Sequence, residues 1–118
     1  MNLKDFDFRL WHKPSKSFVE IKSALFDRAY YVPIDDESVE IELWSGFYDC
    51  KDKKIYENDI VCCYFAMNGL VIFENAMFYV LNQHSGEKKT LFESLHESQA
   101  EKEPFVVESN IHFEKDKA

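Results

Sequence analysis

The alternation of hydrophobic and polar residues predicts short β-strands in the first third of the chain. Residues 6–11 alternate apolar and polar side chains, which is the period of a strand with one buried face. A turn containing Pro14 follows, and residues 17–21 have the pattern of a returning strand. The sequence therefore predicts an N-terminal β-hairpin. Residues 23–33 fit either a helical turn or a strand.

The second half of the chain predicts a longer series of strands. Residues 60–66 are apolar on both faces, as expected of a central strand, and Asn68-Gly69 after them is a strong hairpin signal. Strands over residues 70–73 and 76–82 come next, joined by a turn at Glu74-Asn75. A closing strand is predicted from residue 105 to residue 113. Its apolar face would carry Phe105, Val107, Ile111 and Phe113, and its polar face Glu108, Asn110 and His112.

One short α-helix interrupts this series. Thr90 has the character of an N-cap, Glu93 follows at the spacing of a capping box, and Leu91 and Leu95 share one helical face. The predicted helix covers about residues 90–99. With only three Gly and three Pro, the chain shows no linker, and we expect a single domain over residues 1–118. The expected fold is mainly β: a small SH3-like β-barrel (residues 44–118) with an N-terminal β-hairpin extension (residues 1–43) and the short helix.

The most distinctive stretch runs from residue 43 to residue 61. Large apolar residues lead into a small-residue bend at Ser45-Gly46, a charged turn follows, and a second apolar group completes the stretch. The pattern predicts a surface turn held at both ends, with residues 51–54 in solvent and Asp59 accepting backbone N–H groups at the start of a strand. The anchors in the barrel would be Ile55, Tyr56, Ile60 and Val61.

This stretch resembles the signature of the YopX-like phage and prophage proteins. The resemblance is carried by Trp44-Ser45-Gly46-Phe47, by the charged turn, and by Ile55-Tyr56-Glu57-Asn58-Asp59-Ile60-Val61. Residues 8–11 and 109–114 are similar to the start and the close of that family. Asn58 and Ser109 stand where the family has Gly. The family has no assigned activity, so the resemblance implies a fold and a phage-related origin, with these structural signature residues: Trp44, Gly46, Asp52, Ile55, Tyr56, Asp59, Ile60 and Val61.

The charge of the chain is strongly negative. Its 22 acidic and 14 basic residues give a net charge of −8, which disfavours a nonspecific nucleic-acid binder because such a protein needs a basic surface. In residues 39–43, Val39, Ile41 and Leu43 alternate with Glu40 and Glu42, which predicts a strand with one buried side and one acidic side in solvent. An acidic interaction face would consist of Asp35, Asp36, Glu37, Glu40 and Glu42.

The sequence contains no pattern typical of catalysis, and it predicts no catalytic residue, cofactor or metal. The four histidines are scattered without metal-ligand spacing, and no nucleophile elbow is present. Adjacent Cys62 and Cys63 would point to opposite faces of a strand, which makes them a poor disulfide pair. Trp11 and Trp44 fit either a core position or an exposed anchor. Without a signal peptide or a run of about 20 apolar residues, we expect a cytoplasmic protein without a membrane partner.

Three functions remain open at this point. The first, which we favour, is a non-enzymatic module that binds a protein partner or a second copy of itself. Eleven Phe, six Tyr and two Trp support it, because aromatic side chains dominate binding hot spots. The second is an acidic nucleic-acid mimic that inhibits a DNA-binding host protein. The third is a single-stranded nucleic-acid binder, whose basic residues would be Arg9, Arg28, Lys51, Lys53 and Lys54.

Overall fold

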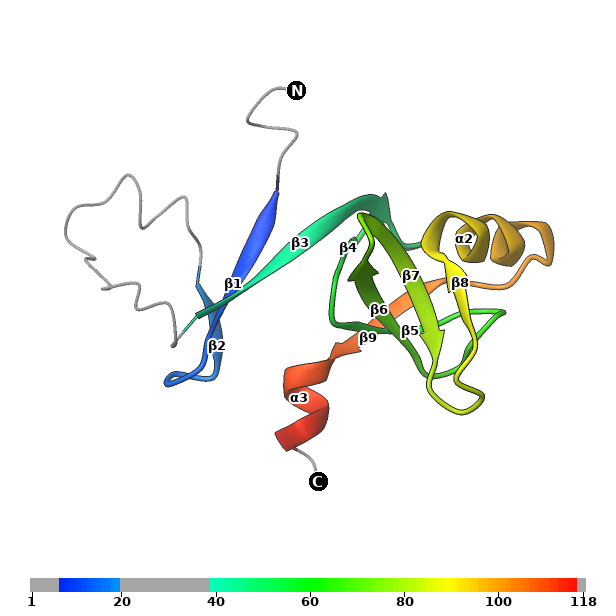
Figure 1. The fold of residues 1–118 in the computed structure, drawn as a ribbon. Coiled ribbons are helices and arrows are strands. Elements are labelled where there is room, and N and C mark those ends of the chain that lie inside the picture. The colour runs from blue at the N-terminus through cyan, green and yellow to red at the C-terminus, as the bar shows by residue number, and fades with distance from the viewer. Residues whose placement is uncertain (1–6, 20–38, 117–118) are drawn as a thin grey trace. The chain divides into compact units, whose positions relative to one another are not determined.

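The computed structural model describes residues 7–19 and 39–116 of the chain (Figure 1). The predictions for residues 23–33, for Arg28 and for Asp35, Asp36 and Glu37 lie outside the described residues. The chain divides into two compact units, residues 1–44 and 45–118, and each is described by itself.

The first unit contains the expected N-terminal hairpin. Strand β1 (Phe8–His12) pairs antiparallel with β2 (Ser17–Val19) through a turn at residues 13–16. On its other side β1 pairs antiparallel with residues 39–43, the beginning of β3 (Val39–Tyr48). Trp11 is buried, and its ring meets that of Phe18 edge-on at 4.9 Å. In the first unit, therefore, the open question about Trp11 is resolved in favour of a core position.

A buried ion pair joins β1 to β3. Arg9 and Glu42 lie opposite each other in the strand register, and Arg9 Nε donates to Glu42 Oε1 at 2.8 Å. Glu42 is fully buried, and the guanidinium of Arg9 lies 4.3 Å from the centre of the Phe18 ring. The prediction that Glu42 lies on a solvent-exposed acidic side of this strand is wrong. Its carboxylate is buried because it pairs with the Arg9 cation on the neighbouring strand. Ile41, expected on the buried side, is 61% exposed.

The second unit is built on a five-stranded antiparallel sheet, ordered β8-β7-β6-β5-β9. Figure 1 shows its strands curling beside helix α2. The strands are β5 (Asp59–Cys62), β6 (Gly69–Glu74), β7 (Met77–Asn82), β8 (Lys88–Thr90) and β9 (Val106–Asn110). Short β4 (Lys54–Tyr56) lies next to β3 in its sheet. The prediction of a mainly β fold with a barrel-like curled sheet and a short helix near residues 90–99 is confirmed. The core consists of Ile55, Val61, Cys63, Ala66, Val71, Val80, Leu91, Phe105 and Val107.

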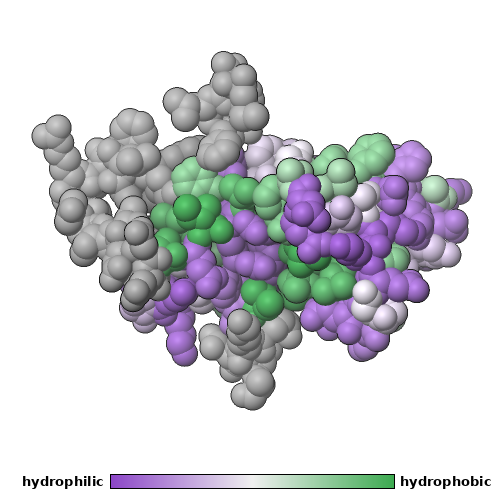
Figure 2. Space-filling model, in the orientation of Figure 1, coloured by the Kyte–Doolittle hydropathy of each residue, from purple (hydrophilic) through white to green (hydrophobic). Residues whose placement is uncertain are grey.

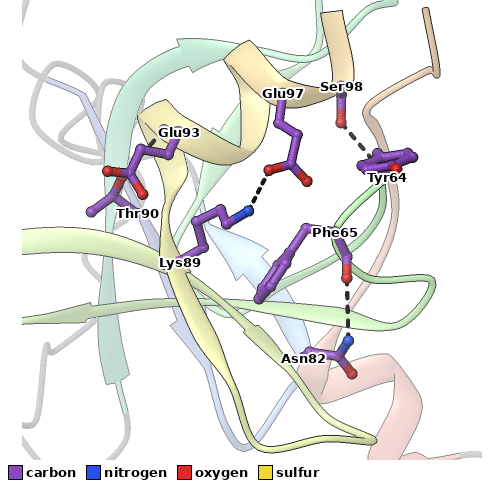
Figure 3. Close-up of polar contacts among 8 residues, drawn as sticks. All are labelled: Tyr64, Phe65, Asn82, Lys89, Thr90, Glu93, Glu97 and Ser98. Carbon is purple, nitrogen blue, oxygen red and sulfur yellow. Dashed lines mark hydrogen bonds and ion pairs between the residues drawn. The ribbon is translucent and has the colours of Figure 1, made fainter. Parts of the chain in front are cut away.

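Helix α2 (Leu91–Ala100) confirms the helix predicted over residues 90–99. Its first turn is capped as expected, since the Glu93 N–H donates to Thr90 Oγ at 3.2 Å. Figure 3 shows this cap together with the ion pair between Lys89 and Glu97, which ties strand β8 to the helix. At the other end Lys102 adopts φ +58°, and the Glu103 N–H donates to the Ser98 carbonyl at 2.9 Å. This is a Schellman ending, with lysine in the left-handed position that glycine usually takes.

Two serines lie on the inner face of α2. Ser94 and Ser98 are both fully buried beside Leu91. The Ser98 hydroxyl accepts the N–H of Tyr64 at 3.2 Å and so holds the loop between β5 and β6 (Figure 3). The Ser94 hydroxyl has no hydrogen-bond partner within the part of the chain that the structure describes. The helix thus buries one satisfied and one unsatisfied hydroxyl.

The hairpin predicted at Asn68-Gly69 forms differently. Strand β5 ends at Cys62, earlier than predicted, and a longer connection precedes β6, which begins at Gly69. A Cβ atom on Gly69 would lie 2.6 Å from Cγ1 of Val80, so this glycine permits close packing rather than a tight turn. The next turn lies at Asn75-Ala76, where both residues have positive φ, the geometry of a two-residue hairpin. Strand β8 was not predicted.

The closing strand is shorter than predicted. Strand β9 ends at Asn110, and residues 111–116 form a helix, α3 (Ile111–Asp116). The pairing of β9 with β5 shifts register between Ile60 and Val61, which skips Glu108 and turns Asn110 into the interior. Buried Asn110 then accepts the N–H of His112 at 2.9 Å, as a helix cap does. The predicted extension of the strand to Phe113 is therefore wrong.

The two buried serines of α2 give a matched test of this packing. We expect Ser94→Ala to raise the free energy of unfolding by about 1 kcal/mol, because it removes a buried hydroxyl that has no partner. Ser98→Ala should lower the free energy of unfolding by about 1 kcal/mol, because the part-buried N–H of Tyr64 loses its acceptor. Urea unfolding at neutral pH measures both. A loss of stability in Ser94→Ala equal to that in Ser98→Ala would contradict this account.

Candidate functional site

Asp49 holds the charged turn of residues 49–54, which we call the knuckle. Its side chain is 5% exposed, and its Oδ1 accepts the N–H groups of Lys51 and Lys53, each at 2.8 Å. Its Oδ2 accepts the N–H of Val107 in β9 at 3.0 Å. Burial alone would raise the pKa of Asp49, but these three backbone donors, aided by the nearby Lys53 cation, lower it below the ordinary 3.8. The carboxylate therefore closes the knuckle and attaches it to the last strand.

The predicted anchors of the stretch around residue 55 lie where the pattern placed them. Ile55, Ile60 and Val61 are buried, and Tyr56 is half-buried. Asp59 is the first residue of β5, almost completely buried, and its Oδ2 accepts the Tyr56 N–H at 2.8 Å. The bend that the sequence predicts between β4 and β5 is thus closed by the carboxylate that the sequence singles out.

The other signature residues have separate local settings. Trp44 is half-buried in β3, whose strand continues through the expected bend to Tyr48. Gly46 takes φ +87° within that strand, and Asp52 is exposed at φ +61° in the knuckle. Asn58, at a position where the resembled family has Gly, adopts φ +68°, a conformation that asparagine tolerates. Ser109 needs no left-handed backbone, since it lies in β9.

A hollow of the second unit lies between the knuckle and α2. It has a volume of about 770 Å³, within the range of ligand-binding clefts. Two of its aromatic side chains reach into solvent: Phe92 is 63% exposed and Tyr48 is 49% exposed. Lys102, whose left-handed backbone ends the helix, lies at its border. The apolar part of its lining consists of Phe47, Tyr48, Phe92, Leu95, Pro104 and Phe105.

A second hollow shares a wall with the first. It has a volume of about 360 Å³, and Phe47 and Phe92 line both hollows. Their ring centres are 6.3 Å apart, so the two rings form a ridge between the hollows. Met77, which lines the second hollow, is 48% exposed. We call the two hollows and the ridge the α2 groove. On the face drawn in Figure 2, hydrophobic residues likewise reach the surface among hydrophilic ones.

The sequence-based prediction did not identify the α2 groove, although one signal was present. If Leu91 and Leu95 face the core, Phe92 lies at the flank of that buried face, followed one turn later by His96. The structure has this arrangement, with the ring of His96 stacked on Phe92 at 6.2 Å. An aromatic residue at the flank of the buried face of a predicted helix is therefore the clue. Tyr48 and Phe105 carried no comparable signal in the sequence. They line the same hollow only because distant segments of the chain pack together.

Two of the three thiols, those of Cys62 and Cys63, are poorly suited to nucleophilic chemistry. All three cysteines are free. Burial raises the pKa of Cys62, with further increases from Glu108 and Glu103. Burial also raises the pKa of Cys63, which lies in the core. A raised pKa lowers the fraction of the reactive thiolate, so neither side chain has the setting of a catalytic nucleophile.

One serine–histidine pair lies at hydrogen-bond distance. His12 Nδ1 is 2.7 Å from Ser15 Oγ, and the backbone N–H of Ser15 donates to the same nitrogen at 3.3 Å. Ser15 Oγ also contacts Ser17 Oγ at 2.8 Å. The pair belongs to the exposed hairpin turn between β1 and β2, where these contacts stabilise the turn. An exposed hydroxyl in a hairpin turn lacks the enclosed site that acyl transfer needs.

None of the helices in the described residues is long and apolar enough to cross a membrane. A comparison with models of known protein families found no match, and neither did a comparison with curated proteins.

Two substitutions separate the anchored part of the knuckle region from its exposed part. Asp59→Ala should lower the free energy of unfolding by about 1–3 kcal/mol, because the Tyr56 N–H loses the buried carboxylate that accepts it. Lys53→Ala should change it by less than about 0.5 kcal/mol, as expected of an exposed side chain. Thermal melts of the two variants provide the measurement. Equal losses, or a larger loss for Lys53→Ala, would show that the knuckle itself is tightly constrained by its lysine.

The lowered pKa of Asp49 predicts a dependence of stability on pH. A carboxyl whose pKa is lower in the folded than in the unfolded chain stabilises the fold above its unfolded pKa and loses this effect as the pH falls through its folded pKa. We therefore expect the stability difference between wild type and Asp49→Asn to be largest at neutral pH and to shrink below about pH 4. Urea unfolding of both proteins across this range measures it. A difference that is constant with pH would contradict the assignment.

Proposed function

We propose that the chain is a non-enzymatic protein-interaction module of the cytoplasm, and that the α2 groove is its binding site. The observation that carries this proposal is the exposure of Phe92 and Tyr48 beside a hollow of about 770 Å³. Large aromatic side chains are usually buried, and those held at a surface next to a cavity are typical of binding hot spots. The resemblance to YopX-like proteins is consistent with a phage or prophage origin.

The chemistry of the groove supports binding rather than catalysis. Asp49, its most deeply buried carboxylate, has both oxygens engaged by backbone donors, and its pKa is lowered. A general base needs a free lone pair and a pKa raised toward neutrality, so Asp49 is unsuited to that role. The remaining ionisable groups that line the larger hollow are all exposed: Tyr48, Cys50, His96, Lys102 and Glu103.

The alternatives receive less support from these residues. A nucleic-acid mimic needs a row of exposed carboxylates, and buried Glu42 cannot contribute to one. A single-stranded nucleic-acid binder needs available cations, whereas Arg9 is committed to Glu42. Self-association by strand pairing is also disfavoured. The edge strand β8 has lysine at two of its three positions, and edge strand β9 donates its Val107 N–H to Asp49.

The groove can be tested with two exposed apolar residues, Phe92 inside it and Met67 outside it. Phe92→Ser should abolish capture of a specific partner from extracts of the source cells, because the ridge of the groove is lost. Met67→Ser should leave capture intact, since Met67 is 79% exposed but lines neither hollow. Both variants should melt within a few degrees of wild type, as exposed substitutions do.

Capture and self-association are measured together in this experiment. Quantitative affinity purification compares the three proteins, and analytical ultracentrifugation reports whether the chain associates with itself. A partner retained equally by Phe92→Ser would refute the groove as the binding site. If the chain is strictly monomeric and Phe92→Ser loses no partner relative to wild type, the proposal of a protein-interaction module is contradicted.

A further inference from the structure

We infer that the α2 groove binds an extended, basic segment of a partner protein, with one apolar side chain of that segment in each hollow. This inference rests on the proposed function and adds the chemistry of the occupant. Three features of the groove support it: the paired hollows, the shape of the ridge between them, and the charge along α2.

The paired hollows define the form of the occupant. Because Phe47 and Phe92 line both, the hollows are immediate neighbours on either side of one ridge. In an extended peptide, side chains at positions i and i+2 point the same way and are roughly 7 Å apart. Such a pair can straddle a ridge of aromatic rings, one side chain on each side. Peptide-binding surfaces that recognise extended segments use pockets for alternate side chains in this way.

The charge of the occupant follows from the acidic wall of the groove. From Glu93 to Glu103 the chain carries four glutamates and a single lysine, Lys102. Glu97 is paired with Lys89, and Glu101 lines neither hollow. Exposed Glu93 lines the second hollow, and exposed Glu103 lines the larger one next to Lys102.

The helix itself adds to this negative wall. Its last turn contains no basic residue, and its C-terminal end carries partial negative charge. Ser98 and Gln99, which lie at this end, line the larger hollow. On the opposite side the knuckle carries both signs, at Lys51, Asp52 and Lys53. A cationic residue of the partner should therefore lie over the C-terminal end of α2.

The aromatic ridge suits the same occupant. The exposed ring of Phe92, with His96 stacked on it, offers a face to a lysine or arginine side chain. The apolar walls of the hollows take the hydrophobic side chains, and the carboxylate of Glu103 can pair with the cation. A segment that combines two apolar residues with neighbouring cations thus satisfies each part of the groove.

The test uses synthetic peptides and the full chain. The probe is a capped Gly/Ser peptide with two Phe separated by one residue and followed by lysines. One control peptide has Glu in place of each Lys, and the other has Ser in place of each Phe. Nitrogen-15 NMR of the chain locates binding, and fluorescence anisotropy measures affinity. We expect the Lys peptide to shift the signals of Phe92, His96 and Gln99, and to bind at least about tenfold more tightly than either control.

Variants of the chain then separate the apolar and the charged contributions. Phe92→Ser should weaken binding of the Lys peptide by at least about tenfold, and Met67→Ser should not change it. Glu103→Lys should weaken binding of the Lys peptide and strengthen that of the Glu peptide. Added salt should weaken binding of the Lys peptide, because screening acts on exposed charges.

Each other outcome overturns the inference in a recognisable way. Equal affinity for the Lys and Glu peptides at the same signals would refute a basic occupant and leave the proposed function standing. Groove signals that shift only with the concentration of the chain itself would assign the groove to a second copy. If no peptide shifts these signals, the inference fails, and the capture experiment with Phe92→Ser decides the proposed function independently.

Discussion

The carboxylate of Asp49 is the interaction on which the second unit depends most. It accepts two N–H groups of its own turn and one from Val107, a residue 58 positions further along the chain. The Cys50 N–H reinforces the link by donating to the Phe105 carbonyl at 3.0 Å. Without this link β9 would present unpaired backbone groups at the edge of the sheet, and the knuckle would have no fixed position. One wall of the α2 groove therefore exists because one buried carboxylate joins two distant segments.

Helix α2 supplies the other wall, and it does so by departing from an ordinary amphipathic pattern. It buries Ser94 and Ser98 while leaving Phe92 in solvent. Moving an aromatic ring inward and a serine outward would increase apolar burial, so this arrangement sacrifices stability. The left-handed Lys102 at its end adds strain that glycine would avoid. Sequences break local folding rules mainly at functional or strained sites, and both departures here adjoin the same hollow.

The elements that the sequence predicted well are those determined by short-range patterns. The cap at Thr90, the bend closed by Asp59 and the hairpin whose turn contains Pro14 each depend on residues a few positions apart. The errors arise where a distant partner decides. Glu42 is buried because Arg9, 33 positions earlier, lies opposite it. Asn110 faces inward because the pairing of β9 with β5 skips a residue. Pairing between residues far apart in the chain cannot be predicted from the pattern of a short sequence window.

The α2 groove combines both kinds of determinant, which explains why it could be predicted only in part. The position of Phe92 at the flank of the buried face follows from helical periodicity and the inward positions of Leu91 and Leu95. The hollow beside it requires Asp49 to hold the knuckle against β9, a contact that only the folded chain reveals. The same contact occupies the free edge of the sheet, while β8 protects the opposite edge with lysines. Because both edges of this sheet are protected from pairing with another strand, we propose that the second unit binds a partner through the apolar side chains of the α2 groove rather than by strand pairing.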